Sequence, residues 1–259
     1  MDLGIAGKNA IVAASSSGLG LACATSLAQE GVNVVLNGRN EERLLAAAEA
    51  LRVNTSVEVR TVAGDIALDS TRVALLAACP APDILVTNNS GPTPGQFTSW
   101  SSEDWHSAID QNMLAPLLLI RDVIDGMVAR NFGRIVNITS AMVKTPLSPM
   151  GLSSAARTGL ISAVKGISRD VVSSNVTINN LLPERINTGR QQQMAKLTAD
   201  FKKITVEQAY EEMAQSIAAK RIGRPEEVGD MCAYLCSVQA SYISGQSIQL
   251  DGGSYAGIF

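Results

Sequence analysis

The chain has 259 residues, which is enough for one large α/β domain or two small ones. Hydrophobic residues make up 46% of it and aromatic residues only 4%, so we expect an aliphatic, alanine-rich core of the kind that helix-covered parallel sheets bury. The formal net charge is −3 and there is no basic run, which argues against a nucleic acid or an anionic membrane as partner. A small-molecule substrate is therefore expected.

Cysteines and the N-terminal segment indicate the compartment. Four cysteines lack CxxC spacing and are expected to be reduced, buried thiols: Cys23, Cys79, Cys232 and Cys236. His106 is the only histidine, so no metal site is expected. The opening MDLGIAGK resembles no signal sequence, and no apolar run approaches the length of a membrane span. We expect a cytoplasmic protein with no membrane association.

Short apolar runs alternate with longer alanine- and leucine-rich stretches. Seven runs are predicted as strands: Asn9–Ala14, Val32–Leu36, Val57–Val62, Ile84–Val86, Gly133–Ile138, Val176–Leu182 and Ser247–Leu250. The stretches between them are predicted as helices, among them Gly18–Gln29, Glu41–Leu51, Glu103–Arg130 and Ser154–Val172. Repeated βα units predict a single Rossmann domain over residues 1–259, a doubly wound, seven-stranded parallel sheet with helices on both faces.

One segment stands apart from this pattern. Residues 188–221 are polar, rich in glutamine and lysine, and weakly amphipathic. Ligands of such folds bind beyond the carboxyl ends of the strands, where an insertion here would lie. We favour a substrate lid; the alternative is two solvated surface helices.

The first strand leads into a short segment that suits a phosphate. Ser15 and Ser17 precede Gly18, Leu19 and Gly20, where the next helix begins. Glycines let the backbone approach a pyrophosphate, and the helix N-terminus offers free N–H groups. Because the segment lies between a strand and a helix, it predicts a nucleotide-binding loop.

This loop resembles the Thr-Gly-x-x-x-Gly-x-Gly motif of the short-chain dehydrogenase/reductase family, with Ala13 and Ala14 in place of the threonine and first glycine. After the second strand, no acid is present to hold a ribose 2′-hydroxyl. Arg39 offers a guanidinium for a 2′-phosphate, which favours NADP(H) over NAD(H); the alternative is that Arg39 caps a surface helix.

The resemblance covers essentially the whole chain and implies further cofactor residues. Asp65 matches the aspartate beside the adenine, and Asn88 lies in a segment similar to the family's Asn-Asn-Ala-Gly. Pro183, Ile186 and Thr188 match the segment near the nicotinamide, although Glu184 replaces its glycine. The C-terminal segments of the family often form subunit contacts, so the resemblance implies a homodimer or homotetramer.

At the catalytic positions the resemblance is incomplete. Asn112 and Ser140 match the asparagine and serine of the family. Counting on from Ser140 places Ser153 and Arg157 where the family has its catalytic tyrosine and lysine. The four tyrosines lie elsewhere, at positions 210, 234, 242 and 255. A serine hydroxyl is a far weaker acid than a phenol, and an arginine does not relay protons at neutral pH.

Two functions remain open at this point. One is an NADP(H)-dependent oxidoreductase that acts on a ketone, such as a 3-oxoacyl substrate or an acidic ketone, with an unusual acid/base. Lys144, four residues after Ser140, is a candidate proton donor, and the alternative for it is a solvated loop lysine. The other function is an NADP(H)-binding sensor or partner subunit with impaired catalysis. We favour the enzyme because Ser140 and Asn112 are retained.

Overall fold

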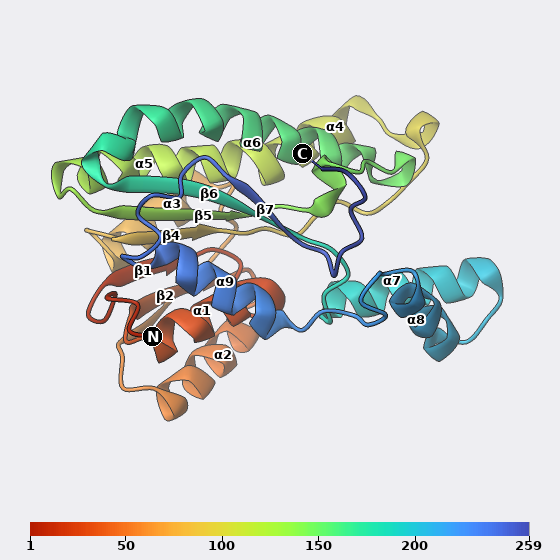
Figure 1. The fold of residues 1–259 in the computed structure, drawn as a ribbon, viewed down its shortest axis with the longest axis horizontal. Helices are drawn as coiled ribbons and strands as arrows, with labels where there is room; N and C mark the ends of the chain where they lie inside the picture. The colour runs from red at the N-terminus through yellow and green to blue at the C-terminus, as the bar shows by residue number, and fades with distance from the viewer. Residues whose placement is uncertain (259) are drawn as a thin grey trace.

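The structure, a computed structural model, describes residues 1–258. Seven parallel strands form one sheet in the order β3-β2-β1-β4-β5-β6-β7 (Figure 1). Their bounds are β1 Asn9–Val12, β2 Asn33–Gly38, β3 Val59–Ala63, β4 Ile84–Thr87, β5 Gly133–Ile138, β6 Val176–Pro183 and β7 Ser247–Leu250. The order reverses between β1 and β4, as expected for a doubly wound sheet, and the predicted fold class is confirmed.

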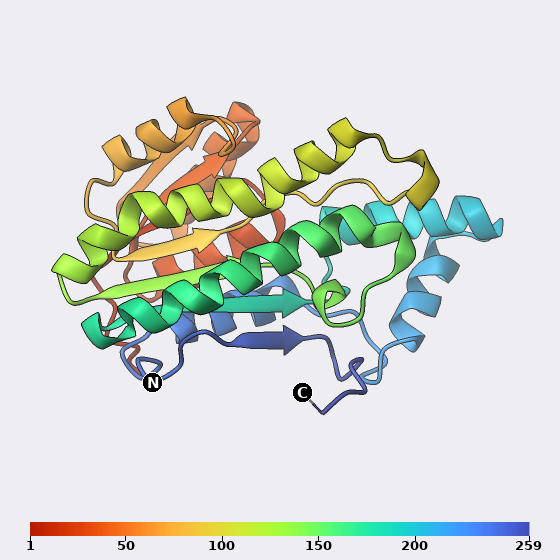
Figure 2. The ribbon, with the colours of Figure 1, turned by 90° about the horizontal axis from the view of Figure 1, so that it is seen from above.

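Helices cover both faces of the sheet (Figure 2). The first face carries α1 (Gly18–Gln29), α2 (Glu41–Asn54) and α9 (Pro225–Cys236). The second carries α3 (Asp69–Ala78), α5 (Ala115–Ala129) and α6 (Gly151–Val171), with α4 (Ser102–Ile109) leading into α5. Parallel strands need such crossovers, and each helix buries one apolar side against the sheet.

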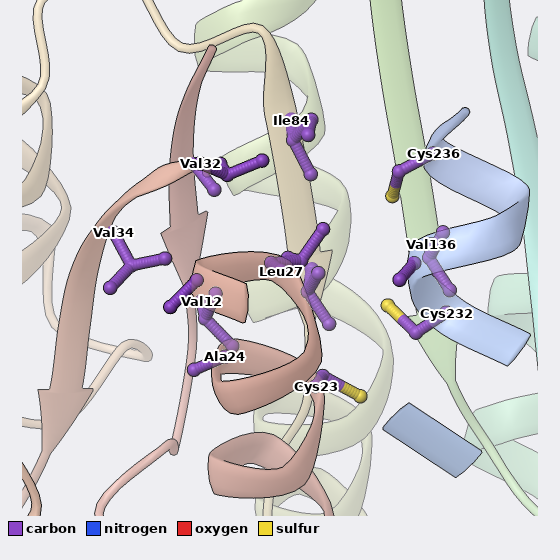
Figure 3. Close-up of a cluster of buried hydrophobic side chains, with 14 of the residues drawn as sticks. Val12, Cys23, Ala24, Leu27, Val32, Val34, Ile84, Val136, Cys232 and Cys236 are labelled. Carbon is purple, nitrogen blue, oxygen red and sulfur yellow. The ribbon is translucent and has the colours of Figure 1, made fainter. Parts of the chain in front are cut away.

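Alternation along the strands divides the core in two. In β1, Ala10 and Val12 belong to the layer under α1, whereas Ile11 belongs to the opposite layer. Figure 3 shows the first layer, where Cys23 of α1 lies near Cys232 and Cys236 of α9. All four cysteines are free and buried, so the prediction of reduced, buried thiols is confirmed.

Several predicted boundaries differ by one to three residues from the structure, and two differences have a clear physical cause. The first strand ends at Val12, because Ala14 turns into the left-handed region with φ 45°. The predicted helix Glu103–Arg130 is interrupted by one turn of π-helix, Asp110–Leu114. Pro116 has no N–H to donate to the carbonyl of residue 112, four positions earlier, so regular α-helical bonding cannot pass through this point.

The segment after β6 projects beyond the carboxyl ends of the strands (Figure 1). It consists of α7 (Gly189–Lys202) and α8 (Val206–Gln215), which pack against each other. The chain enters this segment after Ile186 and leaves it at Gly223, and a β-bridge joins these two residues. Within residues 1–258, none of the helices is long and apolar enough to cross a membrane.

Candidate active site

A cavity of about 470 Å³ lies at the carboxyl edge of the sheet. It is bounded by the loop between β1 and α1, the end of β5, the start of α6 and the N-terminus of α7. A second hollow of about 260 Å³ continues from it between α2 and the segments after β2 and β3. Together the two hollows form one elongated cleft. We name its ends after the cofactor expected from the sequence: the adenosine end lies beside Arg39, and the reaction end lies beside Ser140. This placement agrees with the general rule for ligands of doubly wound sheets.

The loop after β1 has the backbone geometry of a phosphate cradle. Gly18 has φ 59°, and a Cβ on Gly20 would lie 2.4 Å from the carbonyl oxygen of Ala14. Ala14 itself adopts φ 45°, a conformation that normally favours glycine. Its N–H donates to Asn37 Oδ1 at 3.1 Å, and its carbonyl accepts from Asn88 Nδ2 at 3.1 Å. These bonds hold an alanine where the family has glycine.

The predicted residues of this loop have two different roles. Ser17, Gly18 and Leu19 line the cavity. Ser15 does not, because it is completely buried and its hydroxyl donates to the Val12 carbonyl at 2.7 Å. Gly20 is also outside the lining and serves the close approach of the Ala14 carbonyl.

Two arginines face the adenosine end. The Arg39 side chain is 65% exposed, with Nη1 4.0 Å from Asp65 Oδ2. Arg39 does not cap α2, because the Asn40 side chain accepts from the Arg43 N–H and is the N-cap. The cap places Arg43 on the first turn, where it lines both hollows. Sequence reasoning missed Arg43, although Asn40 as a cap and the spacing of four from Arg39 were available signals.

Asparagines connect the loop to the reaction end. Asn88 lines the cavity and holds the Ala14 carbonyl, as described above. Asn112 lies in the π-helical turn and is 3% exposed, with Nδ2 3.4 Å from the Ala108 carbonyl. Its Oδ1 has no hydrogen-bond partner within residues 1–258, and the residue is not among those that line the cavity.

Three of the predicted catalytic residues meet at the reaction end. Ser140 follows β5 and accepts from the Met142 N–H at 3.2 Å. Ser153 and Arg157, one turn apart on α6, line the same cavity as Ser140. Arg157 donates to Ser153 Oγ at 3.2 Å and to the carbonyls of Ile138 at 2.9 Å and Asn89 at 3.2 Å.

Arg157 carries a buried positive charge. Burial, and to a smaller extent the nearby charge of Arg190, lower its pKa to about 10. The guanidinium therefore stays protonated at neutral pH. Because Ser153 accepts its hydrogen bond, the Ser153 hydroxyl hydrogen is free to point into the cavity.

Lys144 lies outside this group. Its Nζ is 5.2 Å from the centroid of the Tyr255 ring, and the residue does not line the cavity. None of the four tyrosines, all within residues 1–258, lines it either. The structure thus brings Ser140, Ser153 and Arg157 together and leaves Lys144 against the C-terminal segment.

The end of β6 and the segment that follows it contribute the remaining wall. Pro183, Ile186 and Thr188 line the cavity, as the resemblance implies. Arg185, with φ 49°, and Arg190 line it as well, and sequence reasoning missed both. Arg190 Nη2 donates to the Pro92 carbonyl at 2.8 Å, which ties α7 to the loop after β4.

The residues that line the cleft fit a dinucleotide that carries an additional phosphate, such as NADP(H). A Cβ on Gly20 would clash with the Ala14 carbonyl, Gly18 has a φ of 59° that side chains rarely adopt, and α1 presents its N-terminus there. Arg39 and Arg43 supply positive charge at the adenosine end, and Asn112 keeps a buried oxygen without a hydrogen-bond partner within residues 1–258. The glycine loop and the two arginines thus border one cleft at the carboxyl edge of the sheet.

Comparisons with known proteins agree with this geometry. A family model described as Enoyl-(Acyl carrier protein) reductase matches residues 13–255. The NADPH-dependent reductase BacG of Bacillus subtilis is 33% identical over 97% of this chain and 99% of its own. The 3-oxoacyl-[acyl-carrier-protein] reductase FabG of Rickettsia felis is 30% identical over 96% of this chain and 97% of its own.

A solved structure and a further sequence relative agree with these matches. The L-sorbose reductase of Gluconobacter frateurii, complexed with NADPH and L-sorbose, superposes with a TM-score of 0.94 at 29% identity and covers both chains completely. The dehydrogenase/reductase SDR family member 4 of Oryctolagus cuniculus is 30% identical over 96% of this chain and 94% of its own. With its fold, its glycine loop and these relatives, the chain belongs to the short-chain dehydrogenase/reductase family of NAD(P)-dependent oxidoreductases.

Proposed function

We propose that this protein is an NADP(H)-dependent oxidoreductase that interconverts a ketone and an alcohol without the tyrosine and lysine typical of its family. One observation carries the proposal: Ser140, Ser153 and Arg157 line the same cavity as the glycine loop. A hydroxyl pair and a fixed cation therefore lie where a nucleotide bound on that loop would extend.

NADP(H) is the proposed cofactor. Arg39 and Arg43 flank the adenosine end, where two guanidiniums suit a 2′-phosphate. Asp65 accepts from Gln111 Nε2 at 3.2 Å and lies 4.0 Å from Arg39, so it borders the same hollow. Relatives named as NADPH-dependent, or solved with NADPH, support this choice. When bound, the cofactor supplies the hydride that reduces the carbonyl carbon.

We propose that Ser140 and Ser153 form hydrogen bonds with the carbonyl oxygen of the substrate. The Ser140 hydroxyl orients it, and the Ser153 hydroxyl, which accepts from Arg157, donates a hydrogen bond to it. The positive charge of Arg157 stabilises negative charge that develops on that oxygen. The proton that completes the alcohol then passes through the serine hydroxyls from solvent.

Lys144 has a smaller role in this proposal than its position in the sequence suggested. Its Nζ faces the Tyr255 ring rather than the cavity. A direct proton transfer from Lys144 would require the loop after β5 to turn. Lys144→Met is therefore expected to leave most of the turnover in place.

A cofactor-binding protein without turnover is the second candidate. It is favoured by the composition of the reaction end, where the ionisable lining groups within residues 1–258 are arginines. Arginines hold charge but exchange protons poorly at neutral pH. In that case the chain acts as an NADP(H) sensor or partner subunit.

One experiment separates the two candidates. NADPH and NADH are titrated by fluorescence, and nicotinamide absorbance is then followed with neutral ketones, acidic ketones and 3-oxoacyl thioesters. Turnover that is lost in Ser140→Ala and Ser153→Ala supports the oxidoreductase. Tight NADPH binding with no turnover across the panel supports the binding protein, and no nucleotide binding contradicts both.

Three further features remain proposals. We expect residues 188–221 to act as a substrate lid of the single domain, since α7 contributes cavity wall and contacts Pro92. We expect a homodimer or homotetramer, in line with the family. We also keep the expectation of a cytoplasmic location, which the four buried free thiols favour.

A further inference from the structure

The reaction end of the cleft has more positive charge than its surroundings balance. The cavity lining includes Arg157, Arg185 and Arg190 at this end and Arg43 towards the adenosine end, and no Asp or Glu within residues 1–258. Taking a charge out of water without a counter-charge is costly, so proteins pair buried ions. The imbalance indicates that a ligand supplies the negative charge.

Arg157 is the most buried of the four, with 7% of its surface exposed. Its three hydrogen bonds go to a hydroxyl and two backbone carbonyls, and all three acceptors are neutral. They satisfy N–H groups but do not neutralise the charge. No carboxylate within residues 1–258 forms an ion pair with Arg157.

Arg190 repeats the pattern from the opposite wall. It donates to the Pro92 carbonyl at 2.8 Å and to Gln193 Oε1 at 3.0 Å, which are again neutral. It has no ion pair among the described residues, and its charge is close enough to lower the pKa of Arg157. Arg185 differs because Glu184 Oε1 lies 3.9 Å from its Nε. Arg157 and Arg190 are thus two uncompensated cations facing one volume.

The phosphates of the cofactor do not account for this pair. The pyrophosphate belongs on the loop at Gly18, and the 2′-phosphate belongs beside Arg39 and Arg43 at the other end of the cleft. In the proposed binding mode, the groups of the cofactor that would extend toward Ser140 are a ribose and the nicotinamide ring, neither of which carries a negative charge. The missing negative charge at the reaction end therefore belongs to the substrate.

We propose that the substrate is an oxo acid whose carboxylate lies close to its carbonyl and is held by Arg157 and Arg190. This substrate class rests on the proposed oxidoreductase function. Guanidinium groups match the planar carboxylate with paired N–H donors. Small 2-oxo or 3-oxo acids meet this requirement, whereas neutral ketones and thioesters carry no charge beside the ketone.

The test compares two ketones that differ only in whether the group beside the carbonyl is a charged carboxylate or a neutral methyl ester. Steady-state kcat/KM with NADPH is measured for 2-oxo-2-phenylacetate and for its methyl ester. The ketone carbonyl of the methyl ester is intrinsically more electrophilic than that of the carboxylate. A preference of the enzyme for the acid therefore reports binding of the carboxylate. We expect the acid to be preferred by about tenfold or more, as one charge-assisted hydrogen bond provides.

Variants of α7 locate the effect. Arg190→Gln is expected to lower kcat/KM for the acid about tenfold and to change the value for the ester less than about twofold. Lys196→Gln removes the same charge from an exposed position of the same helix and is expected to change neither. Equal losses for acid and ester in Arg190→Gln, or equal kcat/KM in the wild type, would overturn the inference.

A binding measurement covers the case without turnover. Calorimetric titration of 2-oxo-2-phenylacetate into the protein with saturating NADP⁺ should show binding that weakens in Arg190→Gln, and the ester should bind more weakly. Turnover of the ester with no advantage for the acid refutes the oxo acid alone. Absence of NADPH binding refutes the proposed function instead, and absence of acid binding refutes the substrate class.

Discussion

The adenosine end and the reaction end of the cleft treat positive charge differently. At the adenosine end, Arg39 is 65% exposed and has Asp65 at 4.0 Å, so water and a carboxylate both moderate its charge. At the reaction end, Arg157 is buried and its partners are neutral. The first arrangement suits a site that binds and releases a cofactor. The second would hold a permanent positive charge beside the reacting atoms in the proposed reaction.

The largest expected effect breaks this difference at the reaction end. Arg157→Met should lower kcat/KM about 100-fold, or roughly 2.7 kcal/mol, because the developing oxyanion loses a preorganised positive charge. Arg169→Met, at an exposed position near the end of the same helix, is the control and should remain within about twofold. Equal activities of the two variants would show that the charge of Arg157 plays no part.

The next effect concerns the cradle shared by both ends. Gly20→Ala should lower the free energy of unfolding by about 2 kcal/mol, because its Cβ would lie 2.4 Å from the Ala14 carbonyl oxygen and 2.9 Å from Asn88 Nδ2. Gly166→Ala, on α6 with nothing within 4 Å of the new Cβ, should instead raise it by about 0.5 kcal/mol. Urea unfolding of both variants checks the contrast, and a neutral Gly20→Ala would refute the close approach.

At the adenosine end, the expected change is about one order of magnitude. Arg39→Ser should weaken NADPH binding about tenfold, or roughly 1.4 kcal/mol, through loss of a charge-assisted contact with the 2′-phosphate. NADH lacks that phosphate, so its binding by the same variant is the internal control and should stay constant. Parallel weakening of both nucleotides in fluorescence titrations would contradict the assignment.

The smallest effect belongs to a charge that is already compensated. Arg221 Nη1 donates to Glu227 Oε2 at 2.9 Å, and this bond, followed by the Arg224 N–H, lowers the Glu227 pKa to about 2. A carboxylate with a depressed pKa stabilises the fold above its ordinary pKa, and this contribution is lost as the pH falls towards 2. Because the pair is exposed, Glu227→Gln should cost about 0.5 kcal/mol at pH 7.

That contribution should shrink as the pH falls from neutrality towards 2. Thermal unfolding of the wild type and Glu227→Gln across this range checks the sign. A difference that grows in acid would contradict the assignment.

The sequence specified the phosphate loop well because its signals are local, although it left Arg43 of the adenosine end unrecognised. A strand, two glycines and a helix within twelve residues define the phosphate loop, and the predicted α1, Gly18–Gln29, has the observed bounds. The seven predicted strands are all present, since short apolar runs and their alternation with helical stretches can be recognised in short windows of sequence. Ser15 was misplaced within the loop because its inward hydroxyl bond to Val12 leaves no trace in the motif.

The reaction end depends on contacts between distant segments. Arg157 bonds to Asn89, 68 positions away, and meets the charge of Arg190 only because α7 folds over the cavity. Nothing local shows which way the loop after β5 turns, so the sequence left Lys144 open as either a proton donor or a solvated loop lysine. The π-helical turn around Asn112 was likewise hidden inside a continuous apolar pattern.

The most direct test of the central claim is isotope transfer. The protein is incubated with NADPH deuterated at the transferable nicotinamide position and 2-oxo-2-phenylacetate or its methyl ester, and the alcohol is examined by mass spectrometry. The account predicts one deuterium on the carbinol carbon with the wild type and none with Ser140→Ala. Bound NADPH without deuterated alcohol from either ketone would contradict it and leave a cofactor-binding protein.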